Sequence, residues 1–374
     1  MSEKTIGIVC SSPGFGGLEL NTLKLARALQ RLGWRVRMLV NESSPMYREA
    51  PAYMGDVTAI QSLGGGKHKT TAALLRRWLA EDPVAVLFTP FNKDIKPLAA
   101  YKRFRNPKIR LVYQQQMKVG VRKRDLIHRL RYNMLDLWIS PLPYLREETM
   151  RLTHVPSERI AVIPLGLDTE PLLQTAMTRE QARAALGIPQ DARLMGVLGR
   201  IDPKKGQDFS IRALAHLEQA HGRKDHLLIM GNITLNEGND YHDLLHHLVQ
   251  EHGLQERVHF RPYHADTSIF YQAIDVFLMP SLGETFGMVT LEAMLAEKPV
   301  IGVNRDGTAA LLENGRLGLL HEPEDMEGFC RQLFLADNIA AMSDMLREAR
   351  RTVLERYTLE DAAAETDRVM TALL

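Results

Sequence analysis

Two glutamates stand eight positions apart in the segment Glu284-Thr-Phe-Gly-Met-Val-Thr-Leu-Glu292. The apolar run ending at Met279 predicts a strand, the next residues predict a loop, and a helix is expected to begin near Phe286–Met288. A carboxylate accepts hydrogen bonds from hydroxyl groups, so Glu284 on the loop suits a sugar and Glu292, two turns into the helix, suits a ribose. The spacing alone is common by chance, whereas the strand, loop and helix around it make the pattern specific.

The start of that helix is a second chemical feature, because the first amides of a helix have no partner inside it. These amides and the helix dipole attract anions, and they suit a diphosphate. The residues expected to take part are Phe286, Gly287, Met288 and Val289, with Tyr263 as a further candidate on the same side.

A pair of cations follows an earlier predicted strand, in the segment Gly199-Arg200-Ile-Asp-Pro-Lys-Lys205-Gly206. An arginine or lysine at a strand end is usually a solvated surface charge. Combined with the glutamate segment, Arg200 and Lys205 are better interpreted as cations that stabilise a leaving diphosphate as its charge builds up. The chain has no Asp-x-Asp segment to hold a divalent ion.

A glycine-rich turn near the N-terminus reads Pro13-Gly14-Phe15-Gly16-Gly17-Leu18-Glu19. A dinucleotide-binding fingerprint needs glycine or alanine at its third position, where this chain has Glu19. The favoured interpretation is a turn whose amides at Gly16 and Gly17 approach the phosphates of a donor. A plain tight turn is the alternative.

Two other patterns are weaker. His242-Asp243-Leu-Leu-His246 is similar to a zinc-protease helix, but aspartate replaces the required glutamate, and a solvated helix face explains it better. The segment Gly64-Gly-Gly-Lys-His-Lys-Thr70 lacks the first glycine of a phosphate loop, so a flexible basic loop is expected there.

The order of the predicted elements indicates two open α/β sheets. Short apolar runs alternate with helical patterns up to Ile160–Pro164, and this order begins again at Leu194–Gly199. Between them, the stretch from Asp168 to Asp191 is charged and loosely patterned, which predicts a domain boundary near residues 166–190. The expected domains are residues 1–166, joined by a C-terminal helix over 357–374, and residues 167–356.

Length and composition agree with this organisation. A chain of 374 residues exceeds what one hydrophobic core usually supports, and its 45% apolar and 25% charged residues are typical of globular proteins. No apolar run reaches the ~18 residues that span a bilayer, and the first residues do not resemble a signal peptide. Cys10 and Cys330 lack metal-ligand spacing and are expected to be reduced. A cytoplasmic protein is therefore expected, with peripheral binding to the inner face of the cytoplasmic membrane as an option.

That option comes from the distribution of charge, since the net charge is only +2. The stretch Lys102–Arg131 contains eleven basic residues and one acid, Asp125. A solvated helix face and a patch that attracts an anionic surface or acceptor are both open interpretations. Nucleic acid is disfavoured, because few aromatic residues are interleaved with the charges and no binding motif is present.

Taken together, these segments resemble the retaining glycosyltransferases of GT-B fold with an E-x7-E motif, the family 4-like "glycosyl transferases group 1". The glutamate segment, Gly199–Gly206, the interdomain segment Val162-Ile-Pro-Leu-Gly-Leu-Asp168 and the N-terminal glycines occur in the family's order. The resemblance implies two Rossmann-like domains facing across a cleft, and a metal-independent transfer with retention of configuration. It also implies an N-terminal acceptor domain and a C-terminal domain for the nucleotide sugar, with UDP-sugars favoured over GDP-sugars. The absence of an Asp-x-Asp segment agrees with the metal independence that the resemblance implies, and no other cofactor is expected.

The chain departs from the family at Tyr113-Gln-Gln-Gln116, where the family often has a histidine. Glutamine can bond a hydroxyl but cannot hold a proton, so Gln115 and Gln116 are candidates for binding the acceptor, not for acid–base catalysis. A cap on the end of the strand is the alternative for one of them. A nucleotide-sugar epimerase and a non-catalytic sugar-nucleotide-binding protein are the alternatives. The basic stretch favours an anionic acceptor, such as a lipopolysaccharide core or a lipid-linked glycan, and hence a role in bacterial envelope glycan synthesis.

Overall fold

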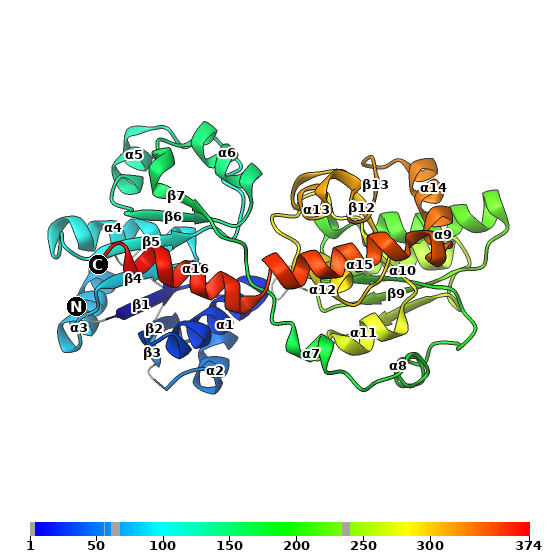
Figure 1. Cartoon of the computed structure of the whole chain (residues 1–374), viewed down its shortest axis with the longest axis horizontal. Coiled ribbons are helices and arrows are strands. Elements are labelled where there is room, and N and C mark those ends of the chain that lie inside the picture. Colours follow the sequence, from blue (N-terminus) through cyan, green and yellow to red (C-terminus); the bar gives the residue numbers. More distant parts are fainter. Residues whose placement is uncertain (1–3, 56, 61–67, 234–239) are drawn as a thin grey trace. The chain divides into compact units, whose positions relative to one another are not determined.

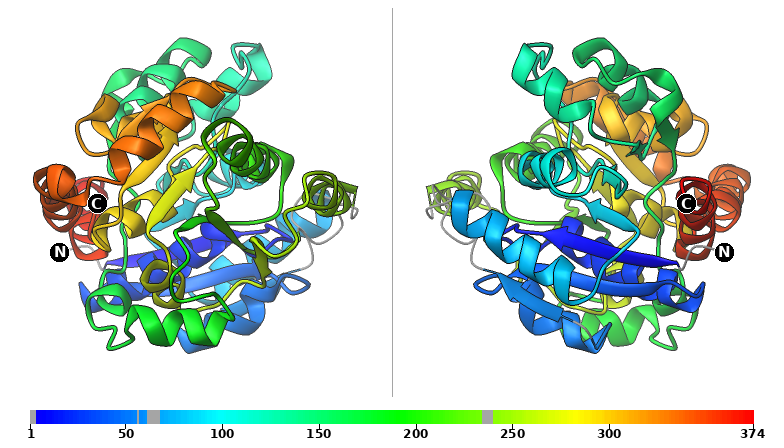
Figure 2. Two further views of the ribbon diagram at one scale, coloured as in Figure 1. Left: turned by 90° about the vertical axis from the view of Figure 1, so that its right-hand side faces the viewer. Right: turned by 90° about the vertical axis from the view of Figure 1, so that its left-hand side faces the viewer.

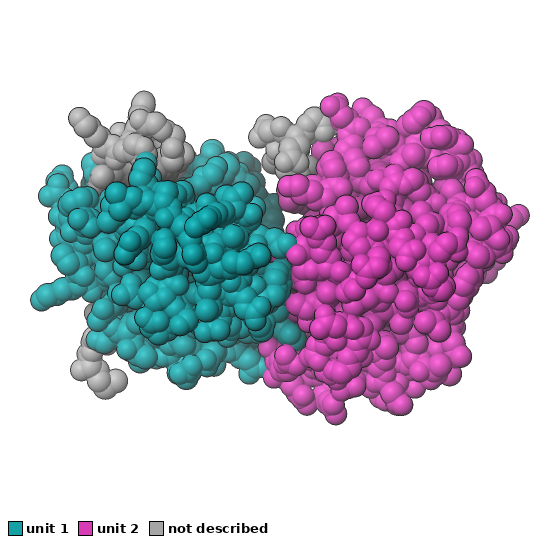
Figure 3. Space-filling view, turned by 90° about the horizontal axis from the view of Figure 1, so that it is seen from above, with its two compact units in different colours: residues 1–166, 357–374 teal, residues 167–356 magenta. Residues whose placement is uncertain are grey.

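The computed structural model describes residues 4–55, 57–60, 68–233 and 240–374. Residues 64–67 of the basic glycine segment therefore lie outside the described residues. The chain divides into two compact units, coloured separately in Figure 3: unit 1 comprises residues 1–166 and 357–374, and unit 2 comprises residues 167–356.

Unit 1 is built on a seven-stranded parallel sheet (Figure 1). In spatial order its strands are β3 (Val57–Ile60), β2 (Arg35–Asn41), β1 (Thr5–Cys10), β4 (Val86–Thr89), β5 (Arg110–Gln114), β6 (Leu137–Ser140) and β7 (Ile160–Val162). Its helices are α1 (Gly17–Arg31), α2 (Pro45–Glu49), α3 (His68–Glu81), α4 (Ile95–Phe104), α5 (Leu126–Tyr132), α6 (Pro143–Leu152) and α16 (Leu359–Thr371).

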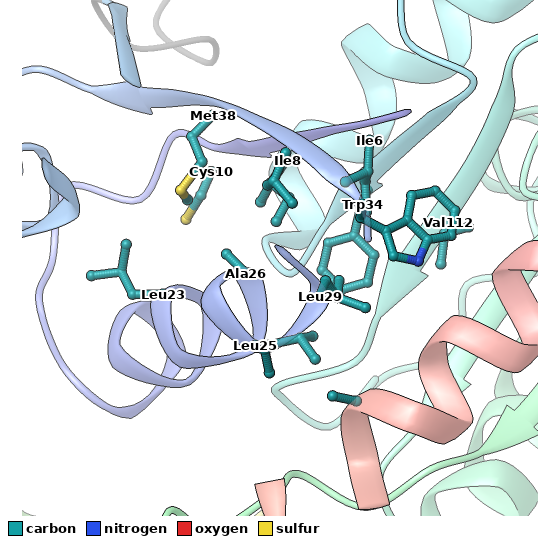
Figure 4. Packing of buried hydrophobic residues seen from close by; sticks show 14 of the residues in the cluster. Ile6, Ile8, Cys10, Leu23, Leu25, Ala26, Leu29, Trp34, Met38 and Val112 are labelled. Atoms are coloured by element: carbon teal, nitrogen blue, oxygen red, sulfur yellow. The ribbon is translucent and has the colours of Figure 1, made fainter. Parts of the chain in front are cut away.

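Helices cover both faces of this sheet (Figure 2), so its central strands β1 and β4 are buried on both sides and are mostly apolar. Ile6, Ile8 and Cys10 of β1 belong to one core cluster, together with Leu23, Ala26 and Leu29 of α1 (Figure 4). Val9 of the same strand belongs to the cluster on the opposite face, with residues of α3 and α4.

The C-terminal helix α16 packs within unit 1, as expected. Asp367 accepts hydrogen bonds from Lys4 (2.6 Å) and from the Trp34 indole (2.8 Å). The start of α16 also lies so close to Gly166 that a Cβ there would be 2.4 Å from the Cα of Leu359. A side chain at position 166 would therefore displace the helix.

Unit 2 has a six-stranded parallel sheet in the order β10 (Val258–Arg261), β9 (His226–Met230), β8 (Leu194–Leu198), β11 (Val276–Met279), β12 (Val300–Val303) and β13 (Leu319–His321). Its helices are α7 (Glu170–Leu173), α8 (Arg179–Leu186), α9 (Gln207–His221), α10 (Asp240–Glu251), α11 (Ser268–Ala273), α12 (Met288–Leu295), α13 (Asp306–Leu311), α14 (Met326–Ala336) and α15 (Ile339–Arg356).

The predicted class of two Rossmann-like α/β units is confirmed. In each sheet the strand order reverses beside the first strand, between β1 and β4 in unit 1 and between β8 and β11 in unit 2. Ligands of open parallel sheets bind outside the carboxyl ends of the strands at such a point. The glycine turn follows β1, and the Arg200 and Glu284 loops follow β8 and β11.

The loosely patterned stretch from Asp168 to Asp191 is more ordered than the sequence suggests, because it contains α7 and α8. Helix α8 begins with a capping box, in which the Thr178 hydroxyl accepts from the Gln181 amide and the Gln181 side chain accepts from the Thr178 amide. It ends at Gly187, whose φ is 64°.

Within the described ranges, no helix combines the length and the apolar character that a membrane span requires.

Candidate functional site

Two loops of unit 2 are tied together at the carboxyl ends of β8 and β11. The Lys204 carbonyl accepts hydrogen bonds from the Leu282 amide (3.1 Å) and from the Ser281 hydroxyl (3.0 Å). Gly206 has a φ of 69°, and a Cβ there would lie 2.6 Å from the Pro280 carbonyl oxygen. This position therefore requires glycine, and the close approach fixes Lys205 beside the second loop.

The structure brings two of the three predicted catalytic residues together, since Lys205 Nζ lies 2.6 Å from Glu284 Oε2. Both side chains are largely covered, with 27% of Lys205 and 14% of Glu284 exposed. The Glu284 backbone is also fixed, because its carbonyl accepts from the Gly307 amide at 3.0 Å.

Arg200 lies on the same loop as Lys205, with its side chain about half exposed. The backbone carbonyl of Arg200 accepts a hydrogen bond at 2.8 Å from the side-chain amide of Gln207, which is fully buried. Its guanidinium lies 3.6 Å from the Asp202 carboxylate. The loop backbone is therefore anchored while the cationic group extends toward solvent.

Helix α12 begins where the sequence predicts it, directly after Gly287. The φ of Gly287 is 100°, and a Cβ there would lie 3.2 Å from the Cγ of Glu284. Glycine thus allows the chain to turn sharply from the Glu284 loop into the helix. Met288 and Val289 at the start of α12 are half-buried, and Phe286 is buried.

Glu292 lies one helical turn beyond Val289 and is half-buried beside Tyr271. The Tyr271 hydroxyl donates to the Val289 carbonyl at 2.9 Å. Burial raises the pKa of Tyr271 well above its usual value, and the nearby Glu292 carboxylate adds a smaller effect in the same direction. The hydroxyl therefore stays protonated and holds this part of α12.

A pocket of about 340 Å³ opens at the carboxyl ends of β8, β9 and β10. Its lining includes Ile201, Asn232, His242, Phe260, Arg261 and Pro262. Ile201 follows Arg200, and Tyr263 follows Pro262; the Tyr263 amide donates to Asn232 at 3.0 Å. The pocket has aromatic and apolar walls, and its lining residue Ile201 directly follows Arg200 in the chain, which suits a planar ring next to a charged group.

The pocket changes the interpretation of His242, which the sequence assigns to a solvated helix face. It lines the pocket, and its Nε2 lies 3.2 Å from that of His246. Burial and the charge of His242 lower the pKa of His246. In the part of the chain that the structure describes, no third ligand completes a metal site with these two. Strand-end position was the only sequence signal for the other lining residues.

The glycine turn of unit 1 is held by side chains. The Gly16 amide donates to the Glu19 carboxylate at 2.8 Å, and the Ser44 hydroxyl donates to the Gly14 carbonyl at 2.7 Å. Glu19 thus occupies the amide of Gly16, one of the two predicted to approach a phosphate. Gly17 is the first residue of α1.

Gln115 and Gln116 lie in different environments. Gln115 is fully buried, and its carbonyl oxygen accepts from Trp138 (3.1 Å), Ser140 (2.9 Å) and Thr149 (3.3 Å). Its side chain therefore joins β5 to β6 and α6 as a structural group. Gln116 is half-buried and donates to the Gln114 side chain at 3.2 Å, so it is the better placed of the two for an acceptor.

A buried carboxyl that the sequence did not indicate lies at the same end of the sheet. Asp94 is 1% exposed and accepts from both the amide (2.8 Å) and the hydroxyl of Ser11, the residue after β1. Burial raises the pKa of Asp94 from 3.8 to about 7.

We expect the Asp94→Asn variant to show a flatter pH dependence of stability. The folded pKa of Asp94 lies above its unfolded value, so the native state binds this proton more tightly. Stability from this group is complete below about pH 4 and is lost as the pH rises toward 7. Thermal melts between pH 5 and 8 should show a smaller decrease in melting temperature for Asp94→Asn than for the wild type. The decrease should be the same as in the wild type for Asp344→Asn, because the Asp344 side chain is 93% exposed.

The basic stretch contains two kinds of residues. Lys102 pairs with Asp136 and is buried, while Arg124 donates to the carbonyls of Thr153 and Met150, both at 3.0 Å. These two cations have structural partners, so the stretch is not one continuous patch. The exposed cations are Arg103, Arg105, Lys108, Arg110, Arg122 and Arg129.

Comparisons with known proteins agree with this architecture. Residues 15–171 match the family model of "Glycosyltransferase Family 4", and residues 178–351 match that of "Glycosyl transferases group 1". A D-inositol 3-phosphate glycosyltransferase of Mycolicibacterium gilvum is 31% identical over 272 residues, or 70% of this chain and 56% of the relative. One from Corynebacterium urealyticum is 36% identical over 180 residues, or 47% of this chain and 42% of the relative. The matches thus span about half the length of these relatives.

Solved structures extend the likeness to the whole fold. Anabaena Alr3699/HepE in complex with UDP has a TM-score of 0.84 at 20% identity, covering 98% of this chain and 100% of its own. A glycosyltransferase from Rickettsia africae has a TM-score of 0.88 at 17% identity, covering 100% and 99%. The predicted GT-B fold is therefore confirmed. The chain belongs to the glycosyltransferases, with a family 4 segment followed by a group 1 segment.

Proposed function

We propose that this protein transfers a sugar from a nucleotide-diphosphate sugar to an acceptor hydroxyl, and that unit 2 binds the donor. The observation that carries the proposal is the contact between Lys205 and Glu284, held by two loops at the switch point of a Rossmann-like sheet. A cation and a sugar-binding carboxylate are thereby placed together where such folds bind nucleotides.

Each part of the nucleotide sugar has residues in unit 2 that can bind it. Glu284 accepts hydrogen bonds from the sugar hydroxyls, and Arg200 with Lys205 neutralises the diphosphate as it leaves. The amides at the start of α12 bind the phosphates or sugar, and Glu292 accepts from the ribose. Before the donor binds, the contact with Glu284 holds Lys205 in position. Two cations supply the charge that a metal supplies elsewhere, so we propose a metal-independent reaction with retention of configuration.

We place the base of the nucleotide in the pocket at the carboxyl ends of β8, β9 and β10, whose lining residue Ile201 directly follows Arg200 in the chain. We favour a UDP-sugar, since similar structures were solved with UDP and with UDP-glucose. A GDP-sugar would need room for a purine in the same 340 Å³.

Unit 1 would bind the acceptor, and its surface favours one at an anionic membrane. Helix α5 and the segment before it expose large apolar side chains, each between 47% and 71% accessible: Met117, Val121, Leu126, Ile127 and Leu130. Exposed Arg122 and Arg129 lie among them. The segment begins at the carboxyl end of β5, the side where ligands bind. Exposed apolar side chains interspersed with arginines suit insertion between anionic headgroups.

This arrangement supports a lipid-linked or lipopolysaccharide-type acceptor in envelope glycan synthesis, with the enzyme on the inner face of the cytoplasmic membrane. One similar structure is a lipopolysaccharide outer core galactosyltransferase, WaaB (TM-score 0.71).

Incubation with UDP-sugars and GDP-sugars, without an acceptor, tests the activity. A glycosyltransferase should slowly release free UDP or GDP and should melt at a higher temperature with its own donor, because a ligand of the native state adds about 2.7 kcal/mol at a hundred times its Kd. Conversion of one nucleotide sugar into another would instead establish an epimerase. A raised melting temperature without turnover, even with lipid extracts added, would establish a binding protein.

The membrane contact is tested by Leu126→Asp/Ile127→Asp. Acidic residues in the first turn suit the helix dipole, so α5 should still fold. The variant should lose co-flotation with phosphatidylglycerol vesicles, whereas release of nucleotide without an acceptor should stay unchanged. Ile339→Asp is the matched control, since Ile339 is an exposed residue in the first turn of α15. Equal flotation of wild type and the double variant would refute the contact.

A further inference from the structure

Three residues with metal-binding side chains meet between α9 and α14 of unit 2, although the sequence gives no metal spacing for them. His216 and His221 lie in the last two turns of α9, and Cys330 lies on α14. Their ligand atoms all lie within 4.8 Å of one another. The donor loop that carries Lys205 precedes the opposite end of α9, so this cluster is not part of the donor site.

The burial of the cluster is graded. Cys330 is 1% exposed and belongs to the core cluster of unit 2, His216 is half-buried and His221 is exposed. An ion can therefore enter from solvent and reach the thiol at the bottom of the site. Burial raises the pKa of Cys330 to about 11, and the Glu327 carboxylate adds to this effect, so the thiol is protonated when no cation is bound.

Neighbouring residues hold both imidazole rings. His216 Nε2 lies 2.9 Å from the Glu327 carboxylate, one turn before Cys330 on α14. The His221 ring packs edge-on against Phe334, with the ring centroids 5.0 Å apart. A carboxylate bonded to one nitrogen of a histidine fixes the tautomer and the orientation of the ring, as in many metal sites.

We propose that this cluster binds one Zn²⁺ ion through the Cys330 thiolate, His216 and His221. Glu327 either remains on His216 or becomes the fourth ligand. Thiolate and imidazole ligands together favour zinc over magnesium or calcium. Tetrahedral zinc, at ~2.0–2.3 Å from each ligand, needs ligand atoms roughly 3.3–3.8 Å apart, so side-chain rotations that close the gaps by about 1 Å complete the site.

The ion would join α9 to α14 and so stabilise the fold of unit 2, a role that goes beyond the proposed transfer reaction and does not depend on it. Binding displaces the thiol proton, which leaves with solvent, so the zinc affinity should rise with pH.

The test uses the full chain after treatment with a chelator. Zinc titrated against a chromophoric competitor should bind with one-to-one stoichiometry and raise the melting temperature. Co²⁺ in the same site should give the charge-transfer absorption of a thiolate ligand together with tetrahedral d–d bands. Cys330→Ser should abolish the charge-transfer band, and each of Cys330→Ser and His221→Ala should weaken zinc binding at least 10–100-fold, the loss typical even of second-shell changes.

His247→Ala on α10 is the matched control, because its side chain is 72% exposed and lies outside the cluster. His221→Ala covers the case in which a change at the buried Cys330 impairs folding. The proposal is overturned if the wild type takes up less than one equivalent of zinc at micromolar concentrations. It is also overturned if His221→Ala binds zinc as tightly as His247→Ala does.

Discussion

Replacing Glu284 by glutamine is expected to lower kcat/KM by about 10²–10³-fold, with little change in the fold. Glutamine keeps the shape and one acceptor oxygen but loses the negative charge that holds Lys205 at 2.6 Å. The same charge strengthens the hydrogen bonds that we propose Glu284 accepts from the sugar hydroxyls. The effect is measured as the steady-state rate of transfer or hydrolysis of the nucleotide sugar that the incubation experiment identifies as the donor. Glu251→Gln, a change at an exposed glutamate of unit 2, should stay within twofold of wild type.

Lys205→Met should lower kcat/KM by a similar factor, because it removes one cation from the leaving diphosphate. The losses in Glu284→Gln and Lys205→Met should not add up in the double variant, since each change already breaks the same contact. If Glu284→Gln keeps its activity within twofold, this carboxylate does not act on the donor sugar. Full additivity would mean that the two residues act independently.

The sheets were predictable from the sequence because both of their faces are covered. Every residue of β1, β8 and β11 is buried, so each strand appears as an unbroken apolar run, and its carboxyl end is marked by glycine, proline or serine. The loops after these strands therefore had to lie at the ligand-binding edges. The loops that carry Arg200 and Glu284 do lie at this edge, directly after β8 and β11, although the sequence contains no information on the distance between them.

Groups that are distant in the sequence could not be found in this way. Cys330 lies more than a hundred residues from His216 and has no ligand spacing to it, and only the packing of α14 on α9 brings them together. Asp94 was likewise unremarkable until its contact with Ser11 appeared. Gln115 was a candidate for binding the acceptor substrate because it follows β5. Its side chain is instead buried by contacts with β6 and α6, which are not evident from the sequence.

The segment between the two sheets contains more regular structure than its loose patterning indicates. The capping box at Thr178 and the terminal Gly187 are sequence signals for α8. These signals are brief, because the helix has only eight residues. The residue that fixes it is charged: Arg183 is the largest fully buried side chain of the described structure.

Replacing Arg183 by methionine should therefore destabilise unit 2 by about 3–5 kcal/mol, as expected when one partner of a buried ion pair is removed. Its guanidinium donates to Asp275 (2.9 Å) and to four backbone carbonyls: Ala273 (2.9 Å), Pro189 (3.2 Å), Gln190 (2.9 Å) and Ala192 (2.7 Å). Methionine fills much of the space but satisfies none of these acceptors, and it leaves the Asp275 carboxylate partly unpaired.

Urea unfolding should show the loss for Arg183→Met, and hydrogen exchange should locate it in α8 and the start of β8, because Asp275 also accepts from the Leu194 amide (2.7 Å). Arg179→Met is the matched control: Arg179 also contacts Asp275 (3.3 Å) but is 39% exposed, so its loss should cost less than about 1 kcal/mol. Equal destabilisation by the two variants would mean that the charge of Asp275, and not the buried set of carbonyls, determines the stability of α8. A larger loss in Arg183→Met would identify a buried cation as the group that fixes α8 within unit 2.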